Sequence, residues 1–146
     1  MNGEPIVILL AEDENGHAEL VRRSLEGAKV ANTLIRVADG QEALDYLYRK
    51  NGFSDPAKSP WPGIIMLDLR MPRVDGLTVL KSIKADPGLM RIPVVILTTS
   101  EAEKDIAEAY DCHANSYLVK PMDFAKFTEL MQTLDFYWLA WNKNPL

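Results

Sequence analysis

The chain has 146 residues, of which 47% are hydrophobic and 25% are charged, as expected of one folded globular domain. Its net charge of -5 argues against a nucleic-acid or membrane-surface binder, because both partners attract a basic excess. No apolar stretch approaches the roughly 20 residues that cross a bilayer, and the N-terminus does not resemble a signal peptide. Cys112 is the single cysteine and excludes an intrachain disulfide, so we expect a cytoplasmic protein without a membrane partner.

Five short apolar runs are predicted to be β-strands. Residues 6–10, 64–67 and 93–97 are continuously apolar, as parallel strands covered on both faces tend to be. Residues 34–37 and 116–119 are more polar, which is typical of strands at the edges of a sheet. The polarity of these runs therefore predicts a sheet with three central strands and two edge strands.

Helical patterns fill the gaps between these runs. Ala18, Val21 and Leu25 share one face of a first helix. Asp39 can cap a second helix, with Glu42 three residues later. Strands that alternate with helices predict an α/β fold in which right-handed crossovers cover both faces of the sheet.

The later helices have their own boundary signals. A third helix must end near Asp86, since Pro87 follows it. Ser100 and Glu103 form a capping box for a fourth, and Asp123 can cap a fifth. The apolar face of the fifth comprises Phe127, Leu130, Met131, Leu134, Tyr137, Trp138 and Trp141. We therefore expect five helices in one domain over residues 1–146, with residues 51–62 as an insertion-like loop rather than a domain boundary.

Polar residues stand where four of the strands end. Glu12 and Asp13 follow the first strand, Asp68 the third, Thr98 the fourth and Lys120 the fifth. Each alone is readily explained as a turn, a cap or an exposed loop residue. In an open parallel sheet, however, these ends lie along one edge, where ligands bind. The combination therefore predicts a site at that edge.

The residue types indicate phosphoryl chemistry. Three crowded carboxylates repel one another, and a divalent cation with oxygen ligands, most simply Mg²⁺, relieves the repulsion. The Lys120 ammonium favours an anionic group in the same place, and the Thr98 hydroxyl can donate to a phosphoryl oxygen. An aspartate such as Asp68 can itself be the nucleophile and form an acyl phosphate.

Residues 8–13, 65–76, 93–99 and 117–121 resemble the receiver domain of two-component response regulators. The resemblance extends over essentially the whole chain. It implies a five-stranded, doubly wound, flavodoxin-like sheet with strand order 2-1-3-4-5, and a signalling protein that catalyses only its own phosphorylation and dephosphorylation.

The resemblance also assigns roles to the metal-site residues. It makes Asp68 the phosphoacceptor and gives Mg²⁺ the carboxylates of Asp13 and Asp68 as ligands. Glu12 would act through a water, and the backbone carbonyl of Arg70 would be a further ligand. The long Arg70 side chain beside the acceptor could slow or steer dephosphorylation.

Three residues of the later strands are assigned to the switch. By resemblance, Thr98 and Lys120 contact the phosphoryl group, and Tyr117 turns inward when Thr98 moves toward it. Thr99 departs from the pattern, because a small Ala or Gly is frequent there, and it is expected to narrow access to the acceptor.

Further features resemble the small response regulators that are paired with bacterial and cyanobacterial phytochromes. They are the long segment before the third strand and residues 84–87, 91–93, 97–100, 121–124 and 136–139. This resemblance implies a phytochrome-type histidine kinase as phosphodonor.

The C-terminal segment is unusually aromatic. It contains Phe136, Tyr137, Trp138, Leu139 and Trp141. Consecutive residues cover every side of a helix, so part of this set is expected to form an exposed apolar interface. We expect a homodimer that uses it. Because little chain follows, the output is expected to be altered protein–protein interaction or onward transfer to a histidine phosphotransfer protein.

Other functions fit less well or stay open. A haloacid-dehalogenase-type phosphatase needs a second aspartate two residues after the nucleophile, where Arg70 stands here. A scaffold without chemistry would not need every site residue. A phosphorelay intermediate for a non-phytochrome kinase is not distinguished by the sequence. His17 and His113 are predicted to be surface or cap residues.

Overall fold

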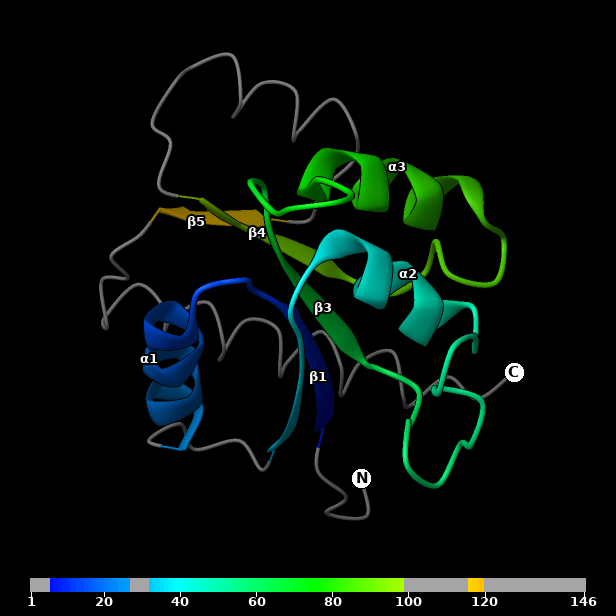
Figure 1. Cartoon of the computed structure of the whole chain (residues 1–146), viewed down its shortest axis with the longest axis horizontal. Coiled ribbons are helices and arrows are strands. Elements are labelled where there is room, and N and C mark those ends of the chain that lie inside the picture. The colour runs from blue at the N-terminus through cyan, green and yellow to red at the C-terminus, as the bar shows by residue number, and fades with distance from the viewer. Residues whose placement is uncertain (1–5, 27–31, 99–115, 120–146) are drawn as a thin grey trace.

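The computed structural model describes residues 6–26, 32–98 and 116–119. The strands of the sheet are β1 (Ile6–Ala11), β2 (Asn32–Val37), β3 (Ile64–Asp68), β4 (Val94–Thr98) and β5 (Ser116–Val119). All neighbouring strands pair in parallel, in the order β2-β1-β3-β4-β5 (Figure 1). The predicted α/β class and strand order are confirmed, and the two more polar strands lie at the edges.

Helices lie on both faces of this sheet. They are α1 (Asn15–Glu26), α2 (Gly40–Leu47) and α3 (Gly76–Ala85). Figure 1 shows α1 on one side of the strands and α2 and α3 together on the other. The predicted fourth and fifth helices lie outside the described residues. In the part of the chain that is described, no helix has the length and apolar character to cross a membrane.

The helix boundaries follow the capping signals. The Asp39 carboxylate accepts a hydrogen bond from the backbone N–H of Glu42 at 2.8 Å, and the Glu42 carboxylate accepts one from Ala38 at 2.7 Å. The reciprocal bond of the predicted capping box therefore reaches one residue further back than expected. The Asp75 carboxylate caps α3 by accepting a hydrogen bond from the N–H of Thr78 at 2.8 Å, and α3 ends at Ala85, immediately before Asp86 as predicted.

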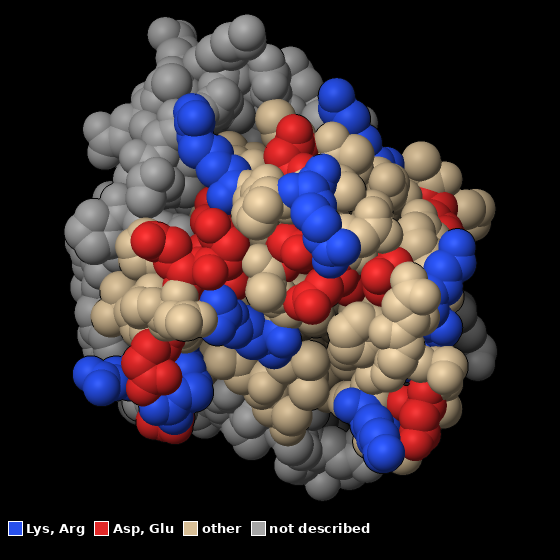
Figure 2. All heavy atoms as spheres, viewed as in Figure 1, with Lys and Arg blue, Asp and Glu red and all other residues tan. Residues whose placement is uncertain are grey.

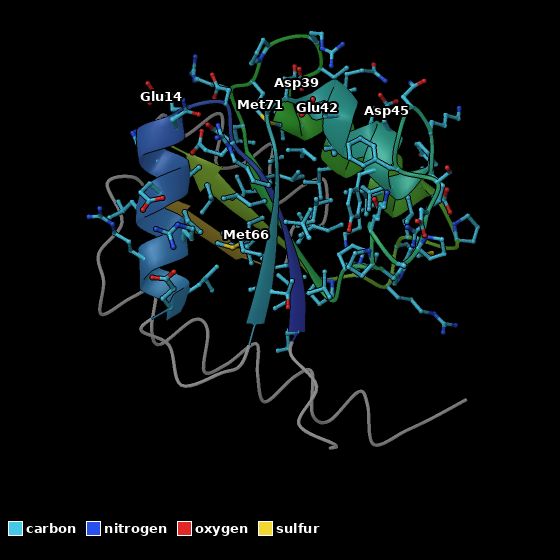
Figure 3. All side chains as sticks on the ribbon, turned by 60° about the horizontal axis from the view of Figure 1, so that its bottom comes forward. Glu14, Asp39, Glu42, Asp45, Met66 and Met71 are labelled. Atoms are coloured by element: carbon cyan, nitrogen blue, oxygen red, sulfur yellow. The ribbon has the colours of Figure 1, made fainter. Side chains whose placement is uncertain are left out.

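Strand alternation divides the apolar core between the two faces. Ile8 and Leu10 of β1 belong to the layer under α1, whereas Leu9 and Ala11 belong to the layer under α2 and α3. Figure 3 shows Met66 of β3 between the sheet and α1. Because both faces are covered, the central strands bury nearly every side chain, which explains their continuous apolar runs.

The long loop before β3 packs against α2. The Tyr46 hydroxyl donates to the Pro60 carbonyl at 2.5 Å, and the Tyr46 ring lies 5.3 Å from that of Phe53. Burial raises the pKa of the Tyr46 hydroxyl. The Arg49 guanidinium lies over the Trp61 ring at 5.4 Å. These contacts hold the loop against the layer formed by α2 and α3, away from the carboxyl edge of the sheet.

Candidate functional site

The carboxyl ends of β1 and β3 bring three acidic side chains together. Ala11 pairs with Leu67, so the next residues along the two strands, Glu12 and Asp68, come alongside each other. One carboxylate oxygen each from Glu12, Asp13 and Asp68 lies within 4.8 Å of the others. On the face of the molecule that Figure 2 shows, acidic side chains gather near the middle, with lysine and arginine among them. The convergence of these residues, predicted from the strand ends, is confirmed.

The three carboxylates differ in exposure. Glu12 is fully buried at 0% exposure and Asp68 is buried at 6%, whereas Asp13 is exposed. A buried carboxylate is stable only with hydrogen bonds or a cation. The Glu12 carboxylate accepts from the N–H of Glu14 at 3.3 Å, and that of Asp68 accepts from the N–H of Arg70 at 3.2 Å. The site therefore has two inner acids held by backbone donors and an outer acid at the surface.

The loop from β3 to α3 folds back onto the acidic site. The N–H of Gly76 donates to the Leu69 carbonyl at 3.0 Å. A side chain at Gly76 would meet the Asp68 carbonyl oxygen at 2.1 Å, so glycine permits this close approach. The Arg70 side chain is exposed in this loop. The first turn of α3 is thereby held directly against the backbone of Asp68.

The structure places the backbone of two predicted switch residues. Leu97 pairs with Asp68, so Thr98 is the next residue on the neighbouring strand, and Tyr117 pairs with Ile96. The side chains of Thr98 and Tyr117 lie outside what the structure describes. Lys120 and the tail residues Phe136, Tyr137, Trp138, Leu139 and Trp141 also lie outside the described residues.

His17 lies beside the acidic site, although the sequence predicted it only as a surface or cap residue. The Nδ1 atom of His17 lies 2.9 Å from the Glu14 carboxylate and 3.8 Å from that of Glu12. Figure 3 places Glu14 at the start of α1. His17 is one helical turn further on, which brings it near the acids. The sequence signal was its spacing of three from Glu14, which places both on one helix face.

The donor set at this edge fits a small divalent cation. All three side chains offer carboxylate oxygens, the ligands that Mg²⁺ and Mn²⁺ prefer. Asp13 is exposed, so water can complete the coordination shell, as Mg²⁺ usually requires. The residues present therefore match the chemistry of Mg²⁺ better than that of Zn²⁺, which prefers sulfur and nitrogen ligands.

A five-stranded parallel sheet in this order, with carboxylates at its carboxyl edge, defines the doubly wound, flavodoxin-like class of α/β proteins. Within this class, residues 8–132 match the family model of the response regulator receiver domain. The chain belongs to that family and is the receiver domain of a two-component response regulator. The match of the family model confirms the resemblance to receiver domains that the motifs at the strand ends indicated.

Several relatives cover nearly the whole chain. "Probable methanogenesis regulatory protein FilR2" of Methanothrix harundinacea is 42% identical, over 97% of this chain and 89% of its own length. Response regulator Rcp1 of Synechocystis is 38% identical, over 92% and 90% respectively. The structure of its Mn²⁺-bound form covers 92% of this chain and 95% of Rcp1, with a TM-score of 0.78. The phosphorylated cyanobacterial phytochrome response regulator RcpA is 36% identical with the same TM-score, over 93% of this chain and 95% of its own.

Proposed function

We propose that this protein accepts a phosphoryl group from a histidine kinase on Asp68 and signals through the phosphorylated form. The observation that carries the proposal is the convergence of the Glu12, Asp13 and Asp68 carboxylates within 4.8 Å at the carboxyl edge of a receiver-family sheet. Asp68 ends the central strand β3, where it pairs with Leu97 of β4 and its carboxylate accepts from the Arg70 N–H. A nucleophile in such a place presents its carboxylate in one orientation.

The proposed step is a transfer between two residues. A carboxylate oxygen of Asp68 attacks the phosphorus of a phosphohistidine, a phosphorus–oxygen bond forms, and the phosphorus–nitrogen bond of the donor breaks. The leaving imidazole takes up a proton from water. The N–H of Arg70, 3.2 Å from the Asp68 Oδ1 atom, holds the carboxylate in place before the attack. Hydrolysis of the acyl phosphate by water returns Asp68 to its initial state.

The cofactor we propose is Mg²⁺. Asp13 and Asp68 would be direct ligands, Glu12 would act through a water, and the Arg70 backbone carbonyl would be a further ligand. When bound, the cation lowers the negative charge at the site so that a phosphoryl group can approach. The oxygen-only donor set supports this assignment, and the Mn²⁺-bound form of Rcp1 suggests that Mn²⁺ can take the same place.

The switch would use Thr98, Tyr117 and Lys120. We propose that Thr98 and Lys120 contact the phosphoryl group, which carries about -1.5 to -2 charge units where the free Asp68 carboxylate carries -1. Tyr117 would turn inward as Thr98 moves toward that charge. The backbone positions of Thr98 and Tyr117, on strands that follow Asp68 across the sheet, are consistent with these roles.

The proposed phosphodonor is a phytochrome-type histidine kinase. The support is the similarity to Rcp1 and to the phytochrome response regulator RcpA, both over more than nine-tenths of this chain. A non-phytochrome kinase is the second candidate. FilR2, which is 42% identical over 97% of the chain, is named as a probable methanogenesis regulatory protein and not as a phytochrome response regulator. Phosphotransfer rates from purified kinases of the two kinds would distinguish them.

The proposed output is protein–protein interaction by a single cytoplasmic domain over residues 1–146. Phe136, Tyr137, Trp138, Leu139 and Trp141 would form the apolar contact of a homodimer, and onward transfer to a histidine phosphotransfer protein is the alternative. Light scattering of the full chain, with and without phosphorylation, tests the dimer. A monomer under both conditions would exclude it.

The central proposal is tested by incubating the protein with Mg²⁺ and acetyl phosphate and measuring its intact mass. We expect the mass of one phosphoryl group to be added, and none in Asp68→Asn. Asp75→Asn is the matched control, since Asp75 lies in the same loop but is exposed and caps α3, a role that asparagine can fill. Equal phosphorylation of wild type and Asp68→Asn would exclude Asp68 as the acceptor.

A further inference from the structure

The Arg36 side chain binds the turn that carries two of the three acids. Arg36 lies near the end of β2. Its Nε and Nη2 atoms donate to the backbone carbonyl of Glu12 at 3.0 and 2.8 Å, and its Nη1 atom donates to the Asn15 side-chain oxygen at 2.7 Å. The guanidinium is rigid and planar, so the three bonds fix the two acceptors relative to each other. Arg36 thereby connects the end of β1 to the first residue of α1.

Glu12 is thus held to β2 through both of its backbone polar groups. Its N–H donates to the Val37 carbonyl at 3.1 Å, and its carbonyl accepts from Arg36. The side chain of Glu12 is restrained in turn by the N–H of Glu14 at 3.3 Å. The backbone next to Asp13 is therefore fixed on one side by the sheet and on the other by the start of α1.

We propose that Arg36 is a positioning residue for divalent-cation binding. By fixing residues 12–15 it holds the Glu12 and Asp13 carboxylates toward Asp68, within the 4.8 Å over which the three converge. This inference rests on the proposed function, since it takes the cation to bind at these acids. In this role Arg36 acts through the backbone of Glu12 and would not itself contact the cation or the phosphoryl group.

The charge of Arg36 and its geometry act on cation binding in opposite directions. A guanidinium near the acids repels a cation, so removing charge alone would make Mg²⁺ bind more tightly. Removing the three hydrogen bonds loosens the turn and adds an ordering cost to cation binding. The direction in which the dissociation constant changes therefore separates a positioning role from a purely electrostatic one.

The experiment measures Mg²⁺ binding to the full chain by isothermal titration calorimetry. In Arg36→Ala we expect the dissociation constant to rise about tenfold, the lower end of what loss of an outer-shell partner costs. Arg36→Lys retains the charge but not the rigid fork, and we expect it to bind almost as weakly. Arg91→Ala is the matched control. Arg91 is exposed and precedes β4, so it lies at the amino ends of the strands, away from the acids at their carboxyl ends. This variant should leave the dissociation constant unchanged. Circular dichroism verifies that each variant is folded.

Three results would overturn the inference. An unchanged or lower dissociation constant in Arg36→Ala, with normal binding in wild type, overturns the role of Arg36 and leaves the proposed function intact. Wild type that neither binds Mg²⁺ nor gains a phosphoryl group overturns both. If Arg36→Ala does not fold, Arg36→Lys and Arg36→Gln carry the comparison, and wild-type affinity in both variants overturns the inference.

Discussion

Arg73 and Asp39 join the loop after β3 to the start of α2 through two parallel hydrogen bonds. Arg73 Nε donates to Asp39 Oδ2 at 2.8 Å, and Arg73 Nη2 donates to Oδ1 at 3.1 Å. Next to Asp39, Gly40 approaches the Val74 carbonyl so closely that a side chain there would lie 1.8 Å from its oxygen. In Figure 3, Asp39 lies at the same end of the molecule as Glu14, which follows the two acids after β1. The pair thus anchors the loop that also carries Arg70.

This ion pair should make stability depend on acid pH. The Arg73 hydrogen bond holds the pKa of Asp39 below its usual 3.8. Because the native pKa is lower than the unfolded one, the stabilisation is complete above about 3.8 and is lost as pH falls through the lowered native pKa. Arg73→Ala should therefore be less stable than wild type at neutral pH, and the difference should vanish in strong acid. Urea denaturation at several pH values measures it.

Variants at Asp39 separate the ion pair from the helix cap. Asp39→Asn should keep the cap on α2 and lose only the charge, whereas Asp39→Ala should lose both and cost about 1 kcal/mol more. Arg73→Ala in the Asp39→Asn background should then have little further effect. If the free energies of unfolding of wild type and Arg73→Ala still differ in strong acid, the ion pair is not the cause of that difference.

Gly76 should be far less tolerant of a side chain than Gly16. The Cβ atom of Gly76→Ala would meet the Asp68 carbonyl oxygen at 2.1 Å, so the first turn of α3 or the backbone of Asp68 must move. We expect the free energy of unfolding to fall by about 1–3 kcal/mol and the rate of phosphorylation to fall with it. Chemical denaturation and intact mass after acetyl phosphate measure the two effects.

Gly16→Ala is the control for the Gly76 prediction. Gly16 lies in α1, and a Cβ atom there would meet nothing within 4 Å. Alanine in a helix is favoured over glycine by about 0.5–1 kcal/mol, so this variant should be more stable than wild type and should phosphorylate normally. Similar stability of the two alanine variants would mean that the close approach at Gly76 does not constrain the site.

The fold and the acidic site could be predicted because their signals are local. The apolar runs and the polar residues at their ends predict the strands. The capping residue Asp39 and the helix-breaking Pro87 predict helix boundaries. Once five strands alternate with helices, the topology brings Glu12, Asp13 and Asp68 to one edge without any knowledge of side-chain geometry. The structure therefore agrees with the sequence where strand order alone decides which residues meet.

The contacts that support the site could not be predicted in this way. Arg36 binds the Glu12 carbonyl across 24 positions of sequence, and Arg73 binds Asp39 across 34. Each contact depends on the register of two elements and on the reach of a long side chain, which no short motif encodes. The roles of Thr98, Tyr117, Lys120 and the aromatic tail depend on side chains that lie outside what the structure describes, and they stay predictions.

Replacing Asp68 should stabilise the protein while abolishing its response to Mg²⁺. Without a cation, the three carboxylates within 4.8 Å repel one another. Asp68→Asn removes one charge and keeps an oxygen to accept the Arg70 N–H, so in EDTA the free energy of unfolding should rise by about 1 kcal/mol. Mg²⁺ at a hundredfold excess over its dissociation constant should stabilise wild type by about 2.7 kcal/mol but leave Asp68→Asn nearly unchanged. Thermal unfolding of both proteins, with Asp75→Asn as the control that responds like wild type, measures this. Equal stabilisation of Asp68→Asn by Mg²⁺ would place the cation elsewhere, because a ligand that has lost its charge cannot bind it as tightly.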